Sequence, residues 1–511
     1  MQKKRFSLIS VYNKSNLKKI CSLFKKNNIE IISTGSTAKY IKKIGYSCYE
    51  VSHFTKFDEI LNGRVKTLHP LVHASLLFDR KNENHKKLFK KLYFPEIIFV
   101  IVNLYPFEKA INNNLNKKKC IEMIDIGGAA LLRSAAKNYD SVTAICDIND
   151  YDAFIENINQ NSGKTSLSFR KKLSSKVFNI TSSYDNLISN WMNDGVDNYD
   201  NDLKITNYEK KSLKYGENPH QKSFFYRNKF QHNLFINYLQ PDKKLSFNNI
   251  LDINSACELL NEFIEPTCAI IKHNIPSGVA SDLIIEKAYL KAYDSDTTSA
   301  FGGIVALNRK INEKIASILI SKFFDIIIAP GFSKKSIEIL KRKSRLILID
   351  IKKINKDKKF EIKSVRNGYL VQEKNRIIFS KKNMKCVSNK KATNQQINDL
   401  IFAFKVSKHT KSNAIILVKN KQTIGIGSGQ TSRIDSTKIA LSKIPKKLKK
   451  VDFVVASDAF FPFTDNIKIL IKKNCKAVIQ PKGSINDYKI IDFANLKRLP
   501  LYFSNYRFFR H

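Results

Sequence analysis

Short apolar runs of strand length alternate with amphipathic segments through the first half of the chain. Residues 6–9 form one such run, apolar residues recur at helical spacing over 17–24, and a second run follows at 29–32. Further apolar runs lie at 97–102 and 142–146. This alternation covers both faces of a sheet with helices, so it predicts a doubly wound α/β fold with a parallel sheet.

The second half of the chain repeats another theme, in which an apolar strand ends in a turn of small or polar residues. Instances are CAIIKH at 268–273, DIIIAPG at 325–331, NAIILVKN at 413–420 with QTIGIGSGQ at 422–430, DFVVASDAF at 452–460 and KAVIQPKGS at 476–484. A chain of 511 residues exceeds the roughly 250 to 300 residues that one hydrophobic core serves, so at least two domains are expected.

Periodicity is lost around 190–210, where Asp and Asn accumulate, and we expect a boundary near residue 200 that separates domains 1–200 and 201–511. The Lys- and Ile-rich stretch 341–358 is expected to be a surface excursion without chemistry.

Several classes of protein are disfavoured by composition. No apolar run approaches the roughly 18 residues that cross a bilayer, and the apolar part after the basic N-terminus is too short for an export signal. Eight cysteines without any C-x-x-C motif predict free thiols in a reducing cytoplasm. His69 and His73 flank Pro70 and lack a third ligand, so zinc is not expected.

The formal charge of +44 invites comparison with nucleic-acid-binding proteins. Lys is spread along the whole chain together with abundant Ile and Asn, and no basic tail or RNA-binding module stands apart. We therefore expect no nucleic-acid partner, and interpret the charge as a compositional background that helps to attract anionic substrates.

Three polar clusters of the first half follow predicted strands. They contain Ser10 and Lys14; Ser33, Thr34, Gly35, Ser36 and Thr37; and Asn103 and Tyr105. Each cluster by itself is better explained as a helix cap, because Ser and Thr are common at the residue that precedes the first turn of a helix. Together, at the carboxyl ends of parallel strands, they would form a cradle for a phosphate.

Two further segments combine candidate catalytic residue types. GRVKTLHP at 63–70 places two cations and a hydroxyl between Gly and Pro, and IDIGGAALLRSAAKN at 124–138 places a carboxylate before a glycine-opened helix. With VNLYPF at 102–107, these segments resemble the inosine monophosphate (IMP) cyclohydrolase domain of the bifunctional purine biosynthesis enzymes. The resemblance implies a methylglyoxal-synthase-like domain that closes the formylated aminoimidazole carboxamide ribonucleotide (FAICAR) to IMP with loss of water.

By this resemblance Lys66 stabilises the oxyanion, Asp125 takes a carboxamide proton, and Tyr105 and Lys137 orient or protonate. The implied substrate contacts are Ser10, Lys14, Ser33, Thr34, Gly35, Ser36, Thr37, Arg64, Thr67, Asn103 and Gly127. A helix over 128–137 separates its ends by about 14 Å at 1.5 Å per residue, so one chain does not bring Asp125 and Lys137 to the same carbon. A site shared between the subunits of a homodimer is therefore expected.

Lys272 and His273 close a predicted strand in the second half. Taken alone, a buried Lys-His pair is better explained as part of the core. Its context is SAFGGIVALNR at 299–309, DIIIAPGF at 325–332, KSNAI at 411–415, GIGSGQTSR at 425–433, SDAFFPFTDN at 457–466 and RFFRH at 507–511. In this order the segments resemble the transformylase domain of the same enzymes, from about residue 214 to the last residue.

The resemblance implies an α/β domain of two cytidine-deaminase-like units. This domain would move a formyl group from 10-formyltetrahydrofolate to the amine of aminoimidazole carboxamide ribonucleotide (AICAR). That amine is a weak nucleophile, so His273 is expected to act as its base, Lys272 as the cation that stabilises the oxyanion or protonates the leaving nitrogen, and Asn413 as a positioning amide. Other implied contacts are Lys214, Tyr215, Phe301, Gly302, Asp325, Arg433, Ile434, Phe460, Pro462, Asn466, Arg507, Phe509 and His511. The deaminase zinc signature is absent from the sequence, so no metal is expected to be required.

A few positions differ from the family pattern. Lys214 stands where Arg is usual and Tyr12 where a small Ser is expected, while Ile275, Asn367 and Thr464 are further differences. None is a predicted catalytic residue, so weaker binding is expected rather than lost chemistry. Two alternatives remain at this stage: a basic RNA-binding protein, and a scaffold that keeps the fold without turnover.

Overall fold

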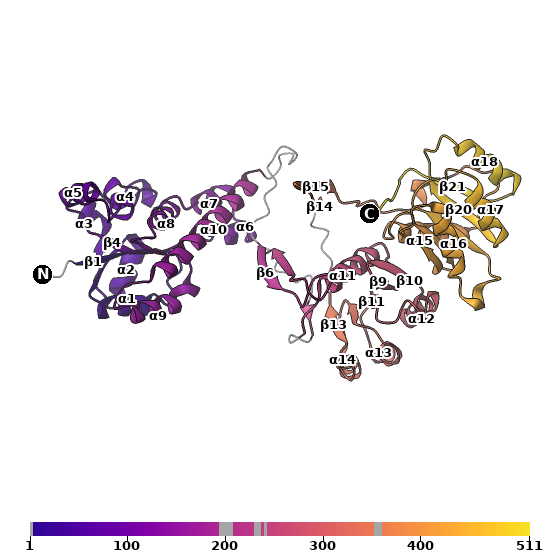
Figure 1. Cartoon of the computed structure of the whole chain (residues 1–511), viewed down its shortest axis with the longest axis horizontal. Coiled ribbons are helices and arrows are strands. Elements are labelled where there is room, and N and C mark those ends of the chain that lie inside the picture. The colour runs from indigo at the N-terminus through magenta and orange to yellow at the C-terminus, as the bar shows by residue number, and fades with distance from the viewer. Residues whose placement is uncertain (1–3, 194–207, 229–236, 240–242, 352–359) are drawn as a thin grey trace. The chain divides into compact units, whose positions relative to one another are not determined.

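The computed structural model describes residues 4–193, 208–228, 237–239, 243–351 and 360–511. The chain divides into two compact units, residues 1–208 and residues 209–511, called unit 1 and unit 2 below (Figure 1). The boundary predicted near residue 200 lies outside the described residues.

Unit 1 contains a five-stranded, fully parallel sheet in the order β3-β2-β1-β4-β5. The strands are β1 (Arg5–Val11), β2 (Ile29–Ser33), β3 (Tyr49–Glu50), β4 (Ile97–Asn103) and β5 (Thr143–Ile145). Four of them contain or overlap the apolar runs of the sequence, and the order reverses direction at β1, which confirms the doubly wound fold.

Helices cover both faces of this sheet (Figure 1). On one face, α1 (Leu17–Lys26), α2 (Gly35–Lys43) and α9 (Tyr151–Gln160) pack on the strands, and on the other α4 (Pro70–Leu77) and α8 (Gly127–Lys137) do so. The long helix α10 (Leu167–Met192) contributes Leu173 to one core and Val177 to the other. The remaining elements are α3 (Val51–Thr55), η1 (Leu61–Gly63), α5 (Glu83–Lys91), α6 (Phe107–Asn112), α7 (Lys117–Glu122) and η2 (Ile148–Asp150).

Unit 2 contains a twelve-stranded mixed sheet in the order β16-β21-β20-β19-β17-β18-β10-β9-β11-β12-β13-β8. Its strands are β8 (Asn237–Tyr238), β9 (Thr267–Lys272), β10 (Ile275–Ser281), β11 (Ile304–Leu307), β12 (Ile326–Ala329), β13 (Ile347–Asp350), β16 (Met384–Cys386), β17 (Ile415–Lys419), β18 (Gln422–Gly427), β19 (Phe453–Ser457), β20 (Cys475–Pro481) and β21 (Leu501–Ser504). Two separate hairpins pair β6 (Tyr208–Ser212) with β7 (Phe224–Asn228) and β14 (Phe360–Val365) with β15 (Gly368–Glu373).

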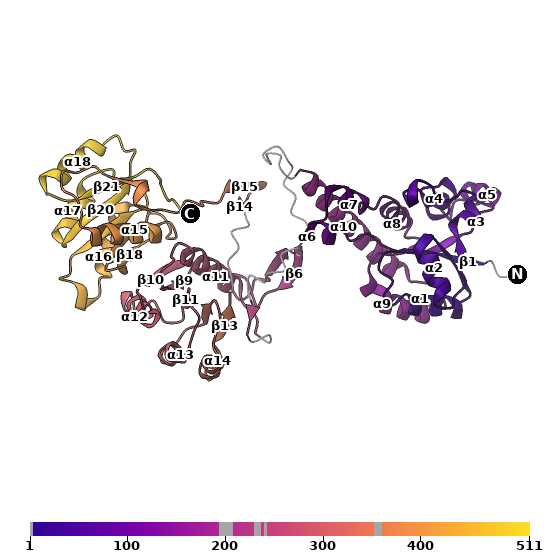
Figure 2. The ribbon, with the colours of Figure 1, turned by 180° about the vertical axis from the view of Figure 1, so that it is seen from behind.

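The helices of unit 2 divide between the two faces of this sheet (Figure 2). The core of one face is formed with α11 (Phe247–Leu260) and α15 (Asn394–Ser407). Two cores lie on the other face, one with α12 (Ile285–Ser295), α13 (Glu313–Leu319) and α14 (Lys334–Lys341), the second with α16 (Arg433–Ser442), α17 (Asp465–Lys472) and α18 (Asp487–Leu496). Short 3-10 turns are η4 (Lys381–Asn383) and η5 (Lys446–Leu448).

The expectation of a surface excursion over 341–358 is wrong for part of that stretch. Residues 347–350 form β13, which pairs in parallel with β12, and the side chains of Leu348 and Ile349 are fully buried. Lys-rich flanks obscured an apolar strand of only four residues. Residues 352–359 lie outside the described part of the chain.

All eight cysteines are free thiols. Across the described ranges, no helix has the length and apolar character needed to cross a membrane. Within the same ranges, no group of three or more His, Cys, Asp or Glu side chains is arranged to hold a metal ion.

The central strand β10 packs against α12 through a glycine. A methyl group on Gly278 would lie 2.0 Å from the carbonyl oxygen of Ala292. We expect Gly278→Ala to lower the free energy of unfolding of unit 2 by about 1 to 3 kcal/mol, because strand and helix must separate to admit the methyl group. Urea unfolding measures the loss. Gly368→Ala is the matched control, since a methyl group there meets no atom within 4 Å, and an equal loss for both variants would contradict the packing argument.

Candidate functional site

The three polar clusters of unit 1 lie together at the carboxyl edge of its sheet. Ser10 near the end of β1 lies beside Thr34, which follows β2, with 3.3 Å between their hydroxyl oxygens. The Asn103 side chain at the end of β4 accepts a hydrogen bond from the backbone N–H of Asn13 at 2.8 Å and donates one to its carbonyl at 3.0 Å. Parallel pairing therefore joins segments that are about ninety positions apart in sequence.

Two of the hydroxyls predicted to bind phosphate hydrogen bond to the backbone of β1. Ser33 Oγ donates to the carbonyl of Ile9 at 2.7 Å. Thr37 Oγ1 accepts from the Val11 N–H at 3.2 Å and donates to its carbonyl at 3.1 Å. Both side chains thus fasten the turn after β2 to β1. Thr34, the N-cap residue of α2, makes no side-chain capping hydrogen bond to the first backbone N–H groups of that helix.

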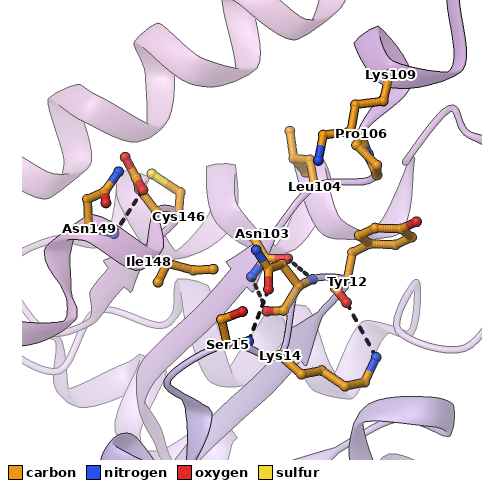
Figure 3. A pocket seen from close by; sticks show the side chains of 12 residues that line it. Tyr12, Lys14, Ser15, Asn103, Leu104, Pro106, Lys109, Cys146, Ile148 and Asn149 are labelled. Carbon is orange, nitrogen blue, oxygen red and sulfur yellow. Dashed lines mark hydrogen bonds between the residues drawn. The ribbon is translucent and has the colours of Figure 1, made fainter. Parts of the chain in front are cut away.

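A cavity of about 670 Å³ opens at this edge (Figure 3). It is lined by Tyr12, Asn13, Lys14, Ser15, Asn103, Leu104, Pro106, Lys109, Cys146, Asp147, Ile148 and Asn149. The Lys14 ammonium donates to the carbonyl of Tyr12 at 3.4 Å, and the Tyr12 ring meets that of Tyr105 edge to face with 5.8 Å between centroids. Lys14 and Lys109 bring positive charge to the lining, and Asp147 brings a negative charge.

Lys66, Tyr105 and Asp125 form a second group in unit 1. Asp125 Oδ1 accepts the N–H of Gly128 at 2.7 Å, and the backbone N–H of Tyr105 also donates to this carboxylate. Burial raises the pKa of Asp125, while the two N–H donors and the Lys66 charge offset part of the rise. Burial, Asp125 and Glu59 raise the pKa of the Tyr105 phenol. A carboxylate with a raised pKa is better suited to accept a proton near neutral pH.

Glycines allow the loops of this group to approach one another. A methyl group on Gly127 would lie 2.9 Å from Thr67 Oγ1. On Gly35 it would lie 3.3 Å from a Glu59 carboxylate oxygen and 3.9 Å from the Lys66 ammonium. Lys66 and Glu59 therefore both reach the start of α2. Glu59 escaped the sequence reasoning because it lies in an exposed loop without a motif.

Two further predicted residues of unit 1 are exposed to solvent. Arg64 is exposed and forms an ion pair with Glu122, whose carboxylate it contacts through Nε at 3.3 Å. Lys137 is the last residue of α8, about 15 Å from its first residue at 1.5 Å per residue, and is exposed. A single chain does not bring Lys137 to Asp125.

In unit 2, Lys272 and His273 lie at the turn of the hairpin β9–β10, with Lys272 paired to Ile275. His273 and Asn274 form the turn with φ of 54° and 65°. Two successive residues with positive φ are typical of a type I′ turn, whose twist matches the strands. The His273 side chain is exposed at this turn. The strand before it belongs to the hydrophobic core, but the histidine does not.

The Lys272 ammonium is held beside a carboxylate. It donates to the carbonyl of Phe301 at 2.7 Å, and the Phe301 ring stacks on that of Phe323 with 4.9 Å between centroids. Burial raises the pKa of Asp325, and the charges of Lys272 and Lys214 offset part of the rise. Residues from four separate segments therefore meet next to the turn.

Asn413 and Arg433 belong to one buried network. Arg433 donates to Asn413 Oδ1 at 2.7 Å and to Ser457 Oγ at 2.9 Å, and it forms an ion pair with the fully buried Asp458. Ser412 Oγ donates to the other oxygen of Asp458 at 2.6 Å. The network aligns the Asn413 amide. Its hydrogen bonds and ion pair also engage the guanidinium of Arg433, one of the implied substrate contacts.

The C-terminal tail joins this network to the His273 turn. The Phe508 N–H donates to the carbonyl of Asp458 at 3.0 Å, and the Arg510 N–H donates to Ser412 Oγ at 3.1 Å. The Arg510 guanidinium reaches Ser255 Oγ at 3.1 Å, and Ser255 in turn donates to the Asn274 side chain.

The other predicted substrate contacts of unit 2 lie in the C-terminal tail, in helices and in the loops that precede or follow strands. Arg507 lies over the Phe509 ring at 4.4 Å, and the ring of His511 follows at 5.6 Å from that of Phe509. Asn466 is buried and accepts from Thr437 Oγ1 at 2.7 Å, so it holds α17 to α16. Phe460 and Pro462 follow β19, Tyr215 precedes α11, Gly302 precedes β11 and Ile434 lies in the first turn of α16.

Strand pairing explains why these residues share one edge of the sheet. β11 and β12 begin beside the end of β9, and β17 begins beside the ends of β18 and β19. Since β18 runs antiparallel to β10, its end points to the same edge as the start of β10. Asp252 and Ser255 of α11 also reach this edge and escaped the sequence reasoning, because a helix interior carries no motif for them. Asp458 lies in a segment quoted for the resemblance and was overlooked.

Known protein families match both parts of the chain. Residues 16–130 match the model of the MGS-like domain, and residues 135–443 match that of the AICARFT/IMPCHase bienzyme. The chain belongs to the AICARFT/IMPCHase bienzyme family. The second match begins in α8 of unit 1 and ends after α16 of unit 2, so it spans both units.

Curated relatives agree with this family along the full length. The bifunctional purine biosynthesis protein PurH of Fusobacterium nucleatum is 43% identical over 506 residues and that of Ruminiclostridium cellulolyticum 42% over 513, each with 99% of both chains covered. The protein of the same name from Thermoanaerobacter sp. is 44% identical over 508 residues with the same coverage. As a member of the bienzyme family, this chain is a bifunctional transferase and hydrolase of purine biosynthesis.

The network of Arg433 and Asp458 makes the bienzyme's second unit sensitive to loss of one charge. We expect Arg433→Met to lower the free energy of unfolding by about 3 to 5 kcal/mol, because it leaves a buried carboxylate without its cation. The double variant with Asp458→Asn removes both charges and should recover most of that loss. Urea unfolding of both single variants and the double variant measures the coupling, and simple additivity of the losses would contradict it.

Proposed function

We propose that each unit carries out one of the two reactions: unit 2 transfers the formyl group to AICAR and unit 1 closes FAICAR to IMP. The observation that carries the proposal is the presence, in each unit, of a lysine whose charge acts on the carboxylate of a nearby aspartate at a sheet edge. In unit 1 these are Lys66 and Asp125, and in unit 2 they are Lys272 and Asp325.

Formyl transfer in unit 2 begins with attack of the AICAR amine on the formyl carbon of 10-formyltetrahydrofolate. His273, exposed at its turn, takes the proton that the amine loses as the new C–N bond forms. Lys272 stabilises the tetrahedral oxyanion. The bond from the formyl carbon to the folate nitrogen then breaks, and a proton from Lys272 or the imidazolium neutralises that nitrogen. Asn413, fixed by Arg433, is placed to hydrogen bond the substrate.

Ring closure in unit 1 joins the carboxamide nitrogen of FAICAR to its own formyl carbon. Asp125 takes the carboxamide proton, which its raised pKa favours, and Lys66 stabilises the oxygen that gains charge. The oxyanion takes the first proton back from Asp125 to become a hydroxyl, which receives a second proton from Tyr105 or Lys137 and leaves as water. As the C=N bond forms, the formamide nitrogen loses its N–H proton to the Asp125 carboxylate. The open N-terminus of α2 and Lys14 are suited to hold the substrate phosphate.

We further propose a cytoplasmic homodimer. Eight free thiols suit a reducing compartment. Lys137 lies at the far end of α8 from Asp125, so its participation requires delivery from a second copy.

Separate substitutions should separate the two reactions. Lys66→Met is expected to lower ring closure at least 100-fold and leave formyl transfer within about twofold, because it removes a cation from the developing oxyanion of one unit alone. Lys272→Met should do the reverse. Purified variants are assayed with AICAR and 10-formyltetrahydrofolate, and separately with FAICAR. Loss of both activities in one variant with unchanged unfolding would refute the division of labour.

A shared ring-closure site predicts complementation between copies. Lys66→Met and Lys137→Met proteins, each inactive in ring closure, should regain up to about a quarter of wild-type activity when co-expressed, since one site of the hybrid dimer contains both lysines. This fraction follows from random pairing of the copies. Each variant co-expressed with itself is the control. Absence of recovery in a purified hybrid dimer would contradict a site that takes Lys66 and Lys137 from different copies.

A further inference from the structure

Unit 2 is built from two repeats of the same order of elements. The first repeat runs through α11, β9, β10, α12, β11, α13, β12, α14 and β13, and the second through α15, β17, β18, α16, β19, α17, β20, α18 and β21. Each has a helix, a hairpin, and then three helix–strand steps. Within the sheet the orders β10-β9-β11-β12-β13 and β18-β17-β19-β20-β21 mirror one another about the β10–β18 contact.

The hairpins of the two repeats have matching turns. His273 and Asn274 join β9 to β10 with φ of 54° and 65°, and Asn420 and Lys421 join β17 to β18 with φ of 51° and 53°. A side chain disfavours positive φ in L-residues, so each turn needs external support to hold its shape. Glycine, which adopts this conformation readily, is absent from both turns.

A helix carboxylate supplies that support in each repeat. In the second repeat Asp399 of α15 accepts the N–H groups of Asn420 and Lys421 at 2.9 Å and 2.8 Å. In the first repeat Asp252 of α11 accepts the N–H of Asn274 at 2.5 Å and also that of His273. The same contact therefore occurs once at each hairpin.

The surroundings of the two turns differ in a way that bears on chemistry. In the second turn, Lys421 forms an ion pair with Glu265, and Lys419 just before the turn forms one with Asp452 at 3.1 Å. Partly exposed salt bridges therefore flank the second turn. The first turn instead lies next to the site of unit 2.

The charges that face Asp252 and His273 come from several elements. Asp325 before β12 acts on Asp252, and Lys272 of β9 and Lys214 before α11 act on Asp325. Arg510 of the tail reaches the turn through Ser255 and is ion-paired with Glu258 of α11.

We infer that Asp252 is a positioning residue for formyl transfer, which fixes the His273 turn and stabilises the imidazolium that forms when His273 takes the amine proton. This inference rests on the proposed role of His273 as the base. Burial raises the pKa of Asp252, and the charge of His273 offsets part of that rise. The two side chains therefore interact electrostatically. A carboxylate close to an imidazole favours the protonated form of that ring.

The repeat provides a matched control for the experiment. Asp252→Asn and Asp399→Asn each replace a carboxylate that accepts two turn N–H groups by an isosteric amide, so they weaken equivalent contacts. The full-length variants are assayed for formyl transfer from pH 5 to pH 9, with ring closure and thermal unfolding measured on the same samples.

We expect Asp252→Asn to lower the kcat of formyl transfer about tenfold or more with little change in the KM for AICAR. The pH at which the rate reaches half of its plateau should fall by about half a unit to one unit, since the imidazolium loses a nearby negative charge. Asp399→Asn should leave kcat within about twofold of wild type and should not displace the pH at which the rate reaches half of its plateau. Asp252→Glu keeps the charge and moves it by one methylene group, so it should lower kcat without displacing the profile.

Two outcomes would overturn the inference. One is an Asp252→Asn profile that superimposes on that of wild type. The other is an equal loss of kcat in both Asn variants, which would make the contact merely structural. If Asp252→Asn does not fold, a displaced profile for Asp252→Glu overturns it instead. His273→Asn separates this question from the proposed function: retained formyl transfer in that variant means His273 is not the base, whatever Asp252 does.

Discussion

The site of unit 2 depends on the antiparallel contact between β10 and β18. This contact joins the two repeats into one sheet, yet its regular pairing is limited to Ala280 opposite Gln422. The fully buried Thr423 side chain extends it, because its hydroxyl accepts the N–H of Val279 at 2.9 Å and donates to the carbonyl at 3.2 Å. A hydroxyl that replaces a backbone partner satisfies both polar groups of a buried residue, whose desolvation would otherwise be costly. Without this contact the Lys272 turn and the Asn413 network would belong to separate sheets.

Close packing of helices on these two central strands depends on small residues. Methyl groups on Gly425 and Gly427 of β18 would lie 2.1 Å and 1.8 Å from carbonyl oxygens of α16. A methyl group on Gly278 of β10 would meet α12 in the same way. The approach of α16 to β18 sets the start of that helix, and with it Arg433, beside Asn413. Packing in the middle of the sheet and geometry at its edge are therefore coupled.

The pKa values of three carboxyl groups are each shifted by opposing influences. Burial raises the pKa of Asp125, Asp252 and Asp325, and in each case N–H donors or lysines restore part of the preference for the charged form. Such opposing influences keep a carboxyl able to exchange or stabilise a proton. A net charge of +44 does not produce this arrangement, since most lysines are far from these groups and are screened by solvent.

Four of the five strands of unit 1, and the polar segments that follow three of them, were determined by the sequence alone. A period of two or of 3.6 residues decides which face of each element is apolar. Family membership also followed from the sequence, since many short segments occur in the expected order. The roles of Asp252, Asp458 and Glu59 were decided only by the tertiary structure. Asp252 acts on a turn 22 positions away and Asp458 on an arginine 25 positions away, through hydrogen bonds that no local pattern encodes. For the same reason, the sequence pattern does not show the hydrogen bonds that Ser33, Thr37 and Asn466 make with partners brought by other elements.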